Sequence, residues 1–144
     1  GGARTSSRFA CALPNRIRAI APVAGLRHDA PCDVTGIPVL TFHGTADGTN
    51  FYGGCNEGDT ACSRNGAWVE GVEAAVNDWR VANGCSAQAR VDALSDKVER
   101  RTFEGCSTGA DVVFYHVVGG THVWPLVSNT TELVRDFFLA QPPR

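Results

Sequence analysis

Methionine and long apolar stretches are both missing from this 144-residue sequence. Because it has no initiator methionine, we expect the polypeptide to be processed or truncated. It begins Gly1-Gly2-Ala3-Arg4, without the basic and apolar segments of a signal peptide. No apolar run is long enough to span a bilayer, and the formal net charge of -2 offers no attraction to nucleic acid or to an anionic membrane. We therefore expect a globular protein with neither nucleic acid nor a membrane as a partner.

Zinc-binding CxxC spacings are also missing, although the chain has six cysteines. An even number of cysteines is better explained by disulfides, which form in an oxidising compartment. We therefore predict a secreted (extracellular) or periplasmic protein, with free buried thiols as the alternative. Many pairings are possible, and the sequence alone does not choose among them. The disulfide candidates are Cys11, Cys32, Cys55, Cys62, Cys85 and Cys106.

The apolar pattern predicts one domain in which helices and strands alternate. Strands are expected at residues 17–23, 37–42, 98–103 and 111–118. Three helices are expected. The first is at residues 5–13, and the second carries apolar Val69, Val72, Val76 and Trp79 and would end at Gly84. The third carries apolar Leu133, Val134, Phe137 and Phe138. This alternation is typical of an α/β fold with a mainly parallel sheet and flanking helices. Asn129 and Glu132 have the spacing of a capping box for the last helix.

Two short segments, residues 43–47 (HGTAD) and 119–125 (GGTHVWP), each follow a predicted strand. Asp47 and His122 are therefore expected on loops past the carboxyl ends of strands, where α/β proteins gather catalytic groups. A neutral histidine takes a proton from a hydroxyl while a carboxylate holds its tautomer. We interpret the two residues as a catalytic acid and base. Taken singly, Asp47 would be a turn residue and His122 a surface histidine.

Residues 105–109 (GCSTG) match the G-x-S-x-G pattern of a nucleophilic serine. That pattern needs a strand before it and a helix after it, whereas here a strand is expected to follow. We therefore interpret Ser107 as structural, in a turn held by a disulfide of Cys106.

The other histidines, His28, His43 and His116, have no second ligand at helical spacing, so we predict no metal site. We interpret His43 as structural, with support of Asp47 as the alternative. Trp124 would either bind substrate or cover the core.

Several segments resemble the secreted polyhydroxybutyrate depolymerase and feruloyl esterase family of α/β-hydrolases. They are, in the family's order, residues 10–14 (ACALP), 18–25 (RAIAPVAG), 43–47 (HGTAD), 83–85 (NGC) and 122–125 (HVWP). Together they are spread over nearly the whole length of the chain. The resemblance implies that Asp47 and His122 belong to a Ser-Asp-His triad.

The same resemblance implies that the serine lies directly before Gly1, or one position further upstream in the S-N-G-G variant of the turn. Residues 1–144 would then be the C-terminal part of a single α/β-hydrolase domain, with the upstream part of that domain as a partner. The family also implies bridges from Cys85 to Cys106 and from Cys11 to Cys32, which leaves Cys55 and Cys62 as a small clip.

The implied function is that of a serine carboxylic-ester hydrolase without a cofactor, acting on polyhydroxyalkanoate or feruloyl-type phenolic esters. Without the upstream serine, we expect the 144-residue chain alone to be inactive. Residues 48–52 (GTNFY) replace the family's usual PVVPY, and the insertion at residues 55–62 is unusual, so the ester is not specified. The alternatives are a disulfide-stapled binding module and a non-catalytic homologue, in which Asp47 and His122 would be structural.

Overall fold

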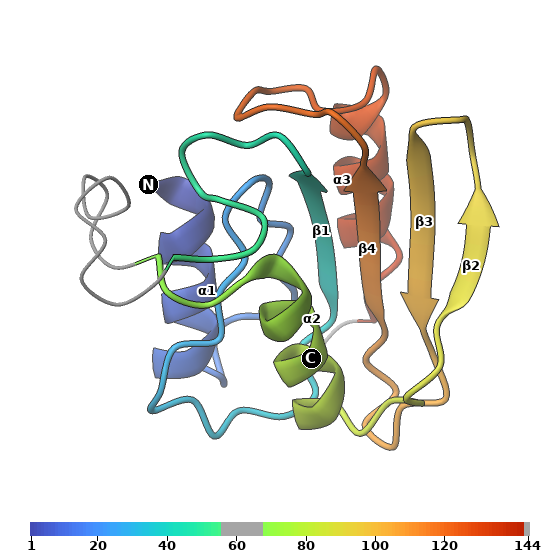
Figure 1. Ribbon diagram of the computed structural model, residues 1–144. Helices are drawn as coiled ribbons and strands as arrows, with labels where there is room; N and C mark the ends of the chain where they lie inside the picture. Colours follow the sequence, from blue (N-terminus) through green and yellow to red (C-terminus); the bar gives the residue numbers. More distant parts are fainter. Residues whose placement is uncertain (56–67, 143–144) are drawn as a thin grey trace.

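The computed structural model describes residues 1–55 and 68–142, which form three helices and a four-stranded sheet (Figure 1). The order of the strands across the sheet is β1-β4-β3-β2. The strands are β1 (Val39–Gly44), β2 (Arg90–Ala93), β3 (Val98–Phe103) and β4 (Val112–Val117). The helices are α1 (Gly2–Ala12), α2 (Val72–Ala82) and α3 (Thr130–Leu139).

The sheet is mixed, so the prediction of a mainly parallel sheet is wrong. Strands β1 and β4 are parallel, but β4 pairs with β3, and β3 with β2, in the antiparallel sense. The reason lies in the connections, because parallel neighbours need a crossover of a dozen or more residues. In the sequence, β3 and β4 are joined by residues 104–111 alone, whereas the connection from β1 to β4 includes α2 and the β2–β3 hairpin. A mixed sheet with flanking helices is compatible with the α/β class.

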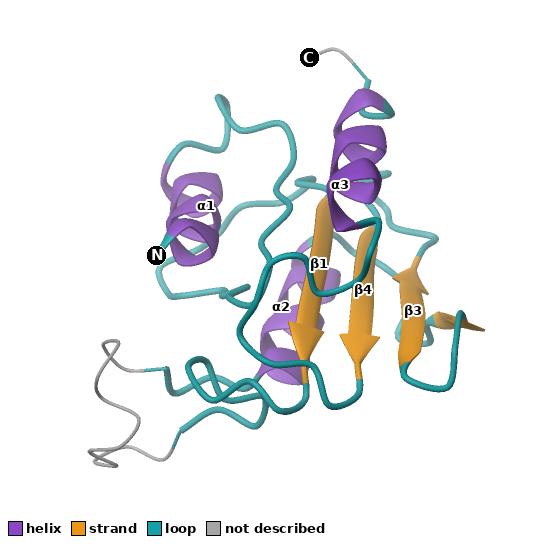
Figure 2. Cartoon of the chain, turned by 90° about the horizontal axis from the view of Figure 1, so that it is seen from above, coloured by secondary structure: helices purple, strands orange, loops and turns teal. Residues whose placement is uncertain are grey.

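The two parallel strands form the centre of the fold. Every residue of β1 is buried, as is typical of a strand covered on both faces. Helix α3 lies against one face of the sheet and α2 against the other (Figure 2). Trp79 of α2 and Phe42 of β1 are completely buried, in separate apolar clusters. Because they are parallel, the carboxyl ends of both strands lie at the same end of the sheet, and the loops that contain Asp47 and His122 follow them there.

The predicted strand at residues 17–23 is not a strand. It runs beside β1 but makes only two isolated parallel bridges, Ile20 with Val39 and Val23 with Phe42. Pro22 explains this, since it has no N–H group to donate to a ladder. The predicted strand at 37–42 begins only at Val39, after Pro38. The predicted strand at 111–118 is one residue shorter at each end.

The hairpin at the far edge was only half predicted. The predicted strand at 98–103 matches β3. Its partner β2 has four residues, three of them exposed, so it carries no apolar pattern that a sequence reading would detect.

Helix ends differ from the predictions in three places. Helix α1 begins at Gly2 rather than at residue 5. Val69 is exposed and precedes α2, although Gly84 follows the helix with a positive φ of 66°, as expected of a glycine stop. The capping box is wrong, because the Asn129 side chain makes no capping hydrogen bond. Instead, the buried Thr130 hydroxyl bonds both the N–H and the carbonyl of Val127.

Among the described residues, two disulfides are formed, Cys11–Cys32 and Cys85–Cys106, which confirms both pairings implied by the resemblance. Cys62 lies outside the described residues, and with it the predicted Cys55–Cys62 clip. Disulfides hint at an oxidising compartment. No helix in the described part of the chain is long and apolar enough to cross a membrane.

Candidate active site

The loops that follow β1 and β4 are joined backbone to backbone. Thr45 N–H donates to the Val117 carbonyl and Ala46 N–H to the Gly120 carbonyl, each at 2.9 Å. The contact is so close that a Cβ atom on Gly44 would overlap the Gly120 backbone. Only glycine fits at that approach, which explains Gly44 and Gly120, whereas Gly119 is explained by its positive φ of 73°. The two loops therefore form one rigid unit at the edge of the sheet.

This unit brings Asp47 and His122 together. The Nδ1 atom of His122 lies 2.9 Å from Oδ2 of Asp47. The Asp47 side chain is fully buried, whereas the His122 side chain is 41% exposed. A carboxylate only accepts, so the neutral ring carries its proton on Nδ1 and leaves Nε2 as an acceptor. A proton acceptor held in one tautomer and open to solvent has the geometry of a general base.

The second oxygen of Asp47 is held by its own loop. Oδ1 accepts the backbone N–H groups of Thr49 and Asn50, each at 2.8 Å. Hydrogen bonds from backbone N–H groups stabilise the charged form of a buried carboxylate. Asp47 therefore has both a structural and a site contact: Oδ1 holds the turn, and Oδ2 contacts His122.

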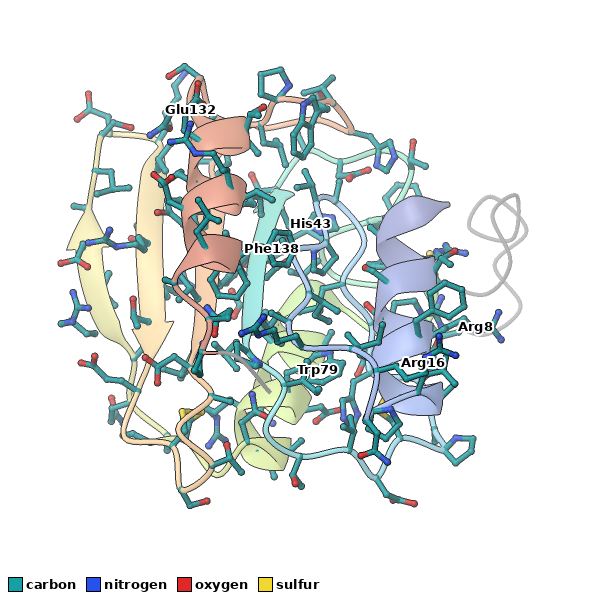
Figure 3. The ribbon with its side chains drawn as sticks, turned by 180° about the vertical axis from the view of Figure 1, so that it is seen from behind. Arg8, Arg16, His43, Trp79, Glu132 and Phe138 are labelled. Atoms are coloured by element: carbon teal, nitrogen blue, oxygen red, sulfur yellow. A yellow bond between two sulfur atoms is a disulfide. The ribbon has the colours of Figure 1, made fainter. Side chains whose placement is uncertain are left out.

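His43 completes the surroundings of Asp47. Its ring is fully buried, with Nε2 at 2.8 Å from the Asn50 carbonyl and 3.3 Å from Asp47 Oδ2. Since the carbonyl must accept, the proton is on Nε2, and Nδ1 has no partner among the described residues. Burial lowers the pKa of His43, although the Asn50 carbonyl and the Asp47 charge act in the opposite direction. His43 is thus a neutral donor shared between two acceptors. Figure 3 shows it in the interior, beside the end of β1.

Trp124 lies two residues beyond His122 and is 56% exposed, so it does not cover the core. It lines an open groove of about 420 Å³, together with residues from α1, α3 and the segment beside β1. The apolar walls include Ala3, Phe9, Ala21, Val23, Trp124 and Phe138. The groove provides apolar surface next to the loop that carries His122.

Ser107 lies at the opposite end of the sheet. Its turn precedes β4, whereas His122 follows that strand, and its N–H donates to the Gly84 carbonyl just after α2. The bridge of Cys106 to Cys85 fixes the turn there. The motif match therefore does not bring a serine to His122.

The remaining histidines stay apart. His28 contacts the edge of Trp79, with 5.0 Å between ring centroids, and His116 lies on β4, 3.9 Å from a Glu99 oxygen. Within residues 1–55 and 68–142, no group of three His, Cys, Asp or Glu side chains is placed to hold a metal ion.

Sequence reasoning underrated His43 and missed Asn50. The spacing of His43 and Asp47 carried a weak signal, because both lie at the end of one strand. Asn50 gave none, since a buried asparagine in a polar loop cannot be told from an exposed one without the chain's path. No protein-family model matches the sequence, and no curated protein matches it either.

Proposed function

We propose that this chain supplies the acid and the base of a serine carboxylic-ester hydrolase. The hydrogen bond of 2.9 Å between buried Asp47 and exposed His122 carries the proposal. In this reaction His122 Nε2 takes the proton of a serine hydroxyl as its oxygen attacks the ester carbonyl. The proton then passes to the leaving alcohol, and water repeats the sequence on the acyl-enzyme. Asp47 stabilises the imidazolium at each stage.

The nucleophile in this proposal is a serine just upstream of Gly1. Helix α1 begins at Gly2, at the end of the molecule where β1 and β4 terminate (Figure 1). Gly2 and Ala3 also line the groove beside Trp124. A residue preceding this helix would lie near the base and near the helix N-terminus, whose N–H groups favour a developing oxyanion.

An unpaired edge supports the presence of a neighbouring segment in the active protein. The backbone groups of Ala19, Ala21 and Val23 make no hydrogen bonds within the described residues, while Ile20 bonds β1 on the other side. An open edge of this kind accepts a further strand. We assign it to the upstream part of the same domain, which brings the serine.

The substrate in this proposal is an ester with an apolar acyl or phenolic group, of the polyhydroxyalkanoate or feruloyl type. The exposed Trp124 ring and the apolar groove support it, because aromatic rings provide stacking surface for such groups. The disulfides and the family resemblance agree with a secreted enzyme.

The test compares two polypeptides, residues 1–144 and the same chain extended by the residues encoded before Gly1. Hydrolysis of p-nitrophenyl acetate, ethyl ferulate and a hydroxybutyrate oligomer is measured for both. We expect turnover only from the extended chain, and its loss in His122→Ala. If residues 1–144 alone hydrolysed an ester and Ser107→Ala abolished that activity, the proposal would be wrong.

A further inference from the structure

Asn50 uses both its backbone and its side chain to join separate parts of the site. Its N–H donates to Asp47 Oδ1 at 2.8 Å, and its carbonyl accepts from His43 Nε2 at 2.8 Å. Its side chain faces the other way, with Nδ2 at 2.6 Å from the Ala24 carbonyl and Oδ1 at 3.1 Å from Arg4 Nη2. The residue is 6% exposed, so these bonds are made in a mostly dry environment.

The side-chain contacts of Asn50 fall where the chain is most constrained. Ala24 is the only non-glycine residue of the described chain with a positive φ, at 54°. Such backbone conformations are costly and persist only when the surroundings hold them. At the next residue, a Cβ on Gly25 would lie 2.8 Å from Ala3 Cβ and 3.4 Å from Asn50 Nδ2. The first turn of α1, the Ala24–Gly25 turn and Asn50 are therefore packed against one another.

We propose that Asn50 is a positioning residue that sets the distance between the Asp47–His122 pair and the first turn of α1. This inference rests on the proposed function, in which α1 directly follows the nucleophile. The Asn50 backbone bonds Asp47 and His43, whereas the Asn50 side chain bonds Arg4 of α1 and the Ala24 turn packed against that helix. Without the side chain, Asp47 keeps its N–H donors and His122 keeps its carboxylate, but α1 loses its tie to them.

The effect is expected in turnover rather than in substrate binding. A misplacement of about 1 Å between reacting groups costs about 10²-fold in rate. In the extended, active chain we expect Asn50→Ala to lower kcat by about 10²-fold and to change KM by less than about threefold. The downfield proton signal of His122 Nδ1–H should remain in the NMR spectrum of the variant, because the bond to Asp47 is untouched.

Asn83 provides the matched control. It is also a buried asparagine with side-chain bonds to backbone groups, but its partners Gly36, Ile37 and Ala110 lie at the opposite end of the sheet. We expect Asn83→Ala to lower the unfolding midpoint at least as much as Asn50→Ala while leaving kcat within about twofold of the wild type.

Two results would overturn the inference while leaving the proposed function in place. If Asn50→Ala left kcat within about threefold of an active wild type, the positioning role would fail and the esterase function would stand. If Asn83→Ala lowered kcat as far as Asn50→Ala, the effect would be one of general stability. An inactive wild-type extended chain would instead overturn the proposed function, and this inference with it.

Discussion

The two ends of the sheet are each organised around a buried asparagine, yet they differ in what that residue holds. At one end, Asn83 bonds backbone groups of its neighbours and accepts the Thr108 hydroxyl on its carbonyl. All of those partners are neutral. At the other end, Asn50 forms hydrogen bonds with the buried Asp47 and the buried His43. Asp47 extends this network to the exposed His122. A closed, neutral network stabilises a turn, whereas a charged network that reaches solvent can exchange a proton.

The largest expected effect comes from removing the charge at the Asp47 end. In the extended chain that we propose to be the esterase, Asp47→Asn should lower kcat by about 10⁴-fold, because the amide no longer selects the His122 tautomer with Nε2 free. Steady-state kinetics on a p-nitrophenyl ester measure this. A loss below about tenfold would mean that the contact between Asp47 and His122 is only structural.

The next effect concerns stability at the Asn83 end. Asn83→Ala should lower the free energy of unfolding by about 3 kcal/mol, because it leaves buried backbone donors and acceptors of Ile37 and Ala110 without partners. Urea denaturation measures this. A loss below about 0.5 kcal/mol would show that water replaces the amide, and the Asn83 network would then be open to solvent rather than closed.

The two disulfides should contribute equally to stability but differ in their effect on kcat. Cys85–Cys106 lies at the Asn83 end, and Cys11–Cys32 ties α1; both span 21 residues of sequence. Equal loops predict equal losses of about 3 kcal/mol for the two double Cys→Ser variants. Denaturation of both variants in parallel tests this. Only the Cys11–Cys32 variant should also lower kcat, since α1 contacts the site. Equal losses of kcat in both variants would contradict the distinction between the ends.

A smaller effect is expected from pH. Because burial lowers the pKa of His43, the folded protein favours the neutral ring, whereas the unfolded chain gains a proton near its ordinary value of 6.5. Stability from this group is therefore complete above that value and is lost as the pH falls below it. Urea denaturation at about pH 7.5 and about pH 5.5 should show a steeper loss for the wild type than for His43→Gln, which keeps a donor but does not titrate. The matched variant Asn83→Ala should keep the wild-type slope. Burial also lowers the pKa of His116, so some slope remains in His43→Gln.

The last variant, Ser107→Ala, is expected to have no effect on kcat. Ser107 is exposed at the far end of β4, so Ser107→Ala should leave kcat of the extended chain unchanged within error. A large loss of activity would place the chemistry at the Asn83 end and reverse the comparison.

The sequence predicted the parts of this site that depend on local pattern. Asp47 and His122 were found because each follows an apolar run, and runs of this kind make strands whose ends are known. The His43 network was not found, because burial of a polar loop depends on the packing of α1 and the Ala24–Gly25 turn. Pro22 was visible in the sequence, but its effect on the neighbouring ladder was underrated. Strand β2 was missed since an exposed edge strand of four residues has little pattern to detect.

The close approach of Gly44 and Gly120 has a consequence for anyone who wishes to redesign this protein. Because a Cβ on Gly44 would overlap the Gly120 backbone, a substitution at Gly44 has to displace the other loop, although 75 positions separate Asp47 from His122 in the sequence. A library that varies Gly44 therefore has to vary the segment around Gly120 with it. The two loops have to be engineered as a pair.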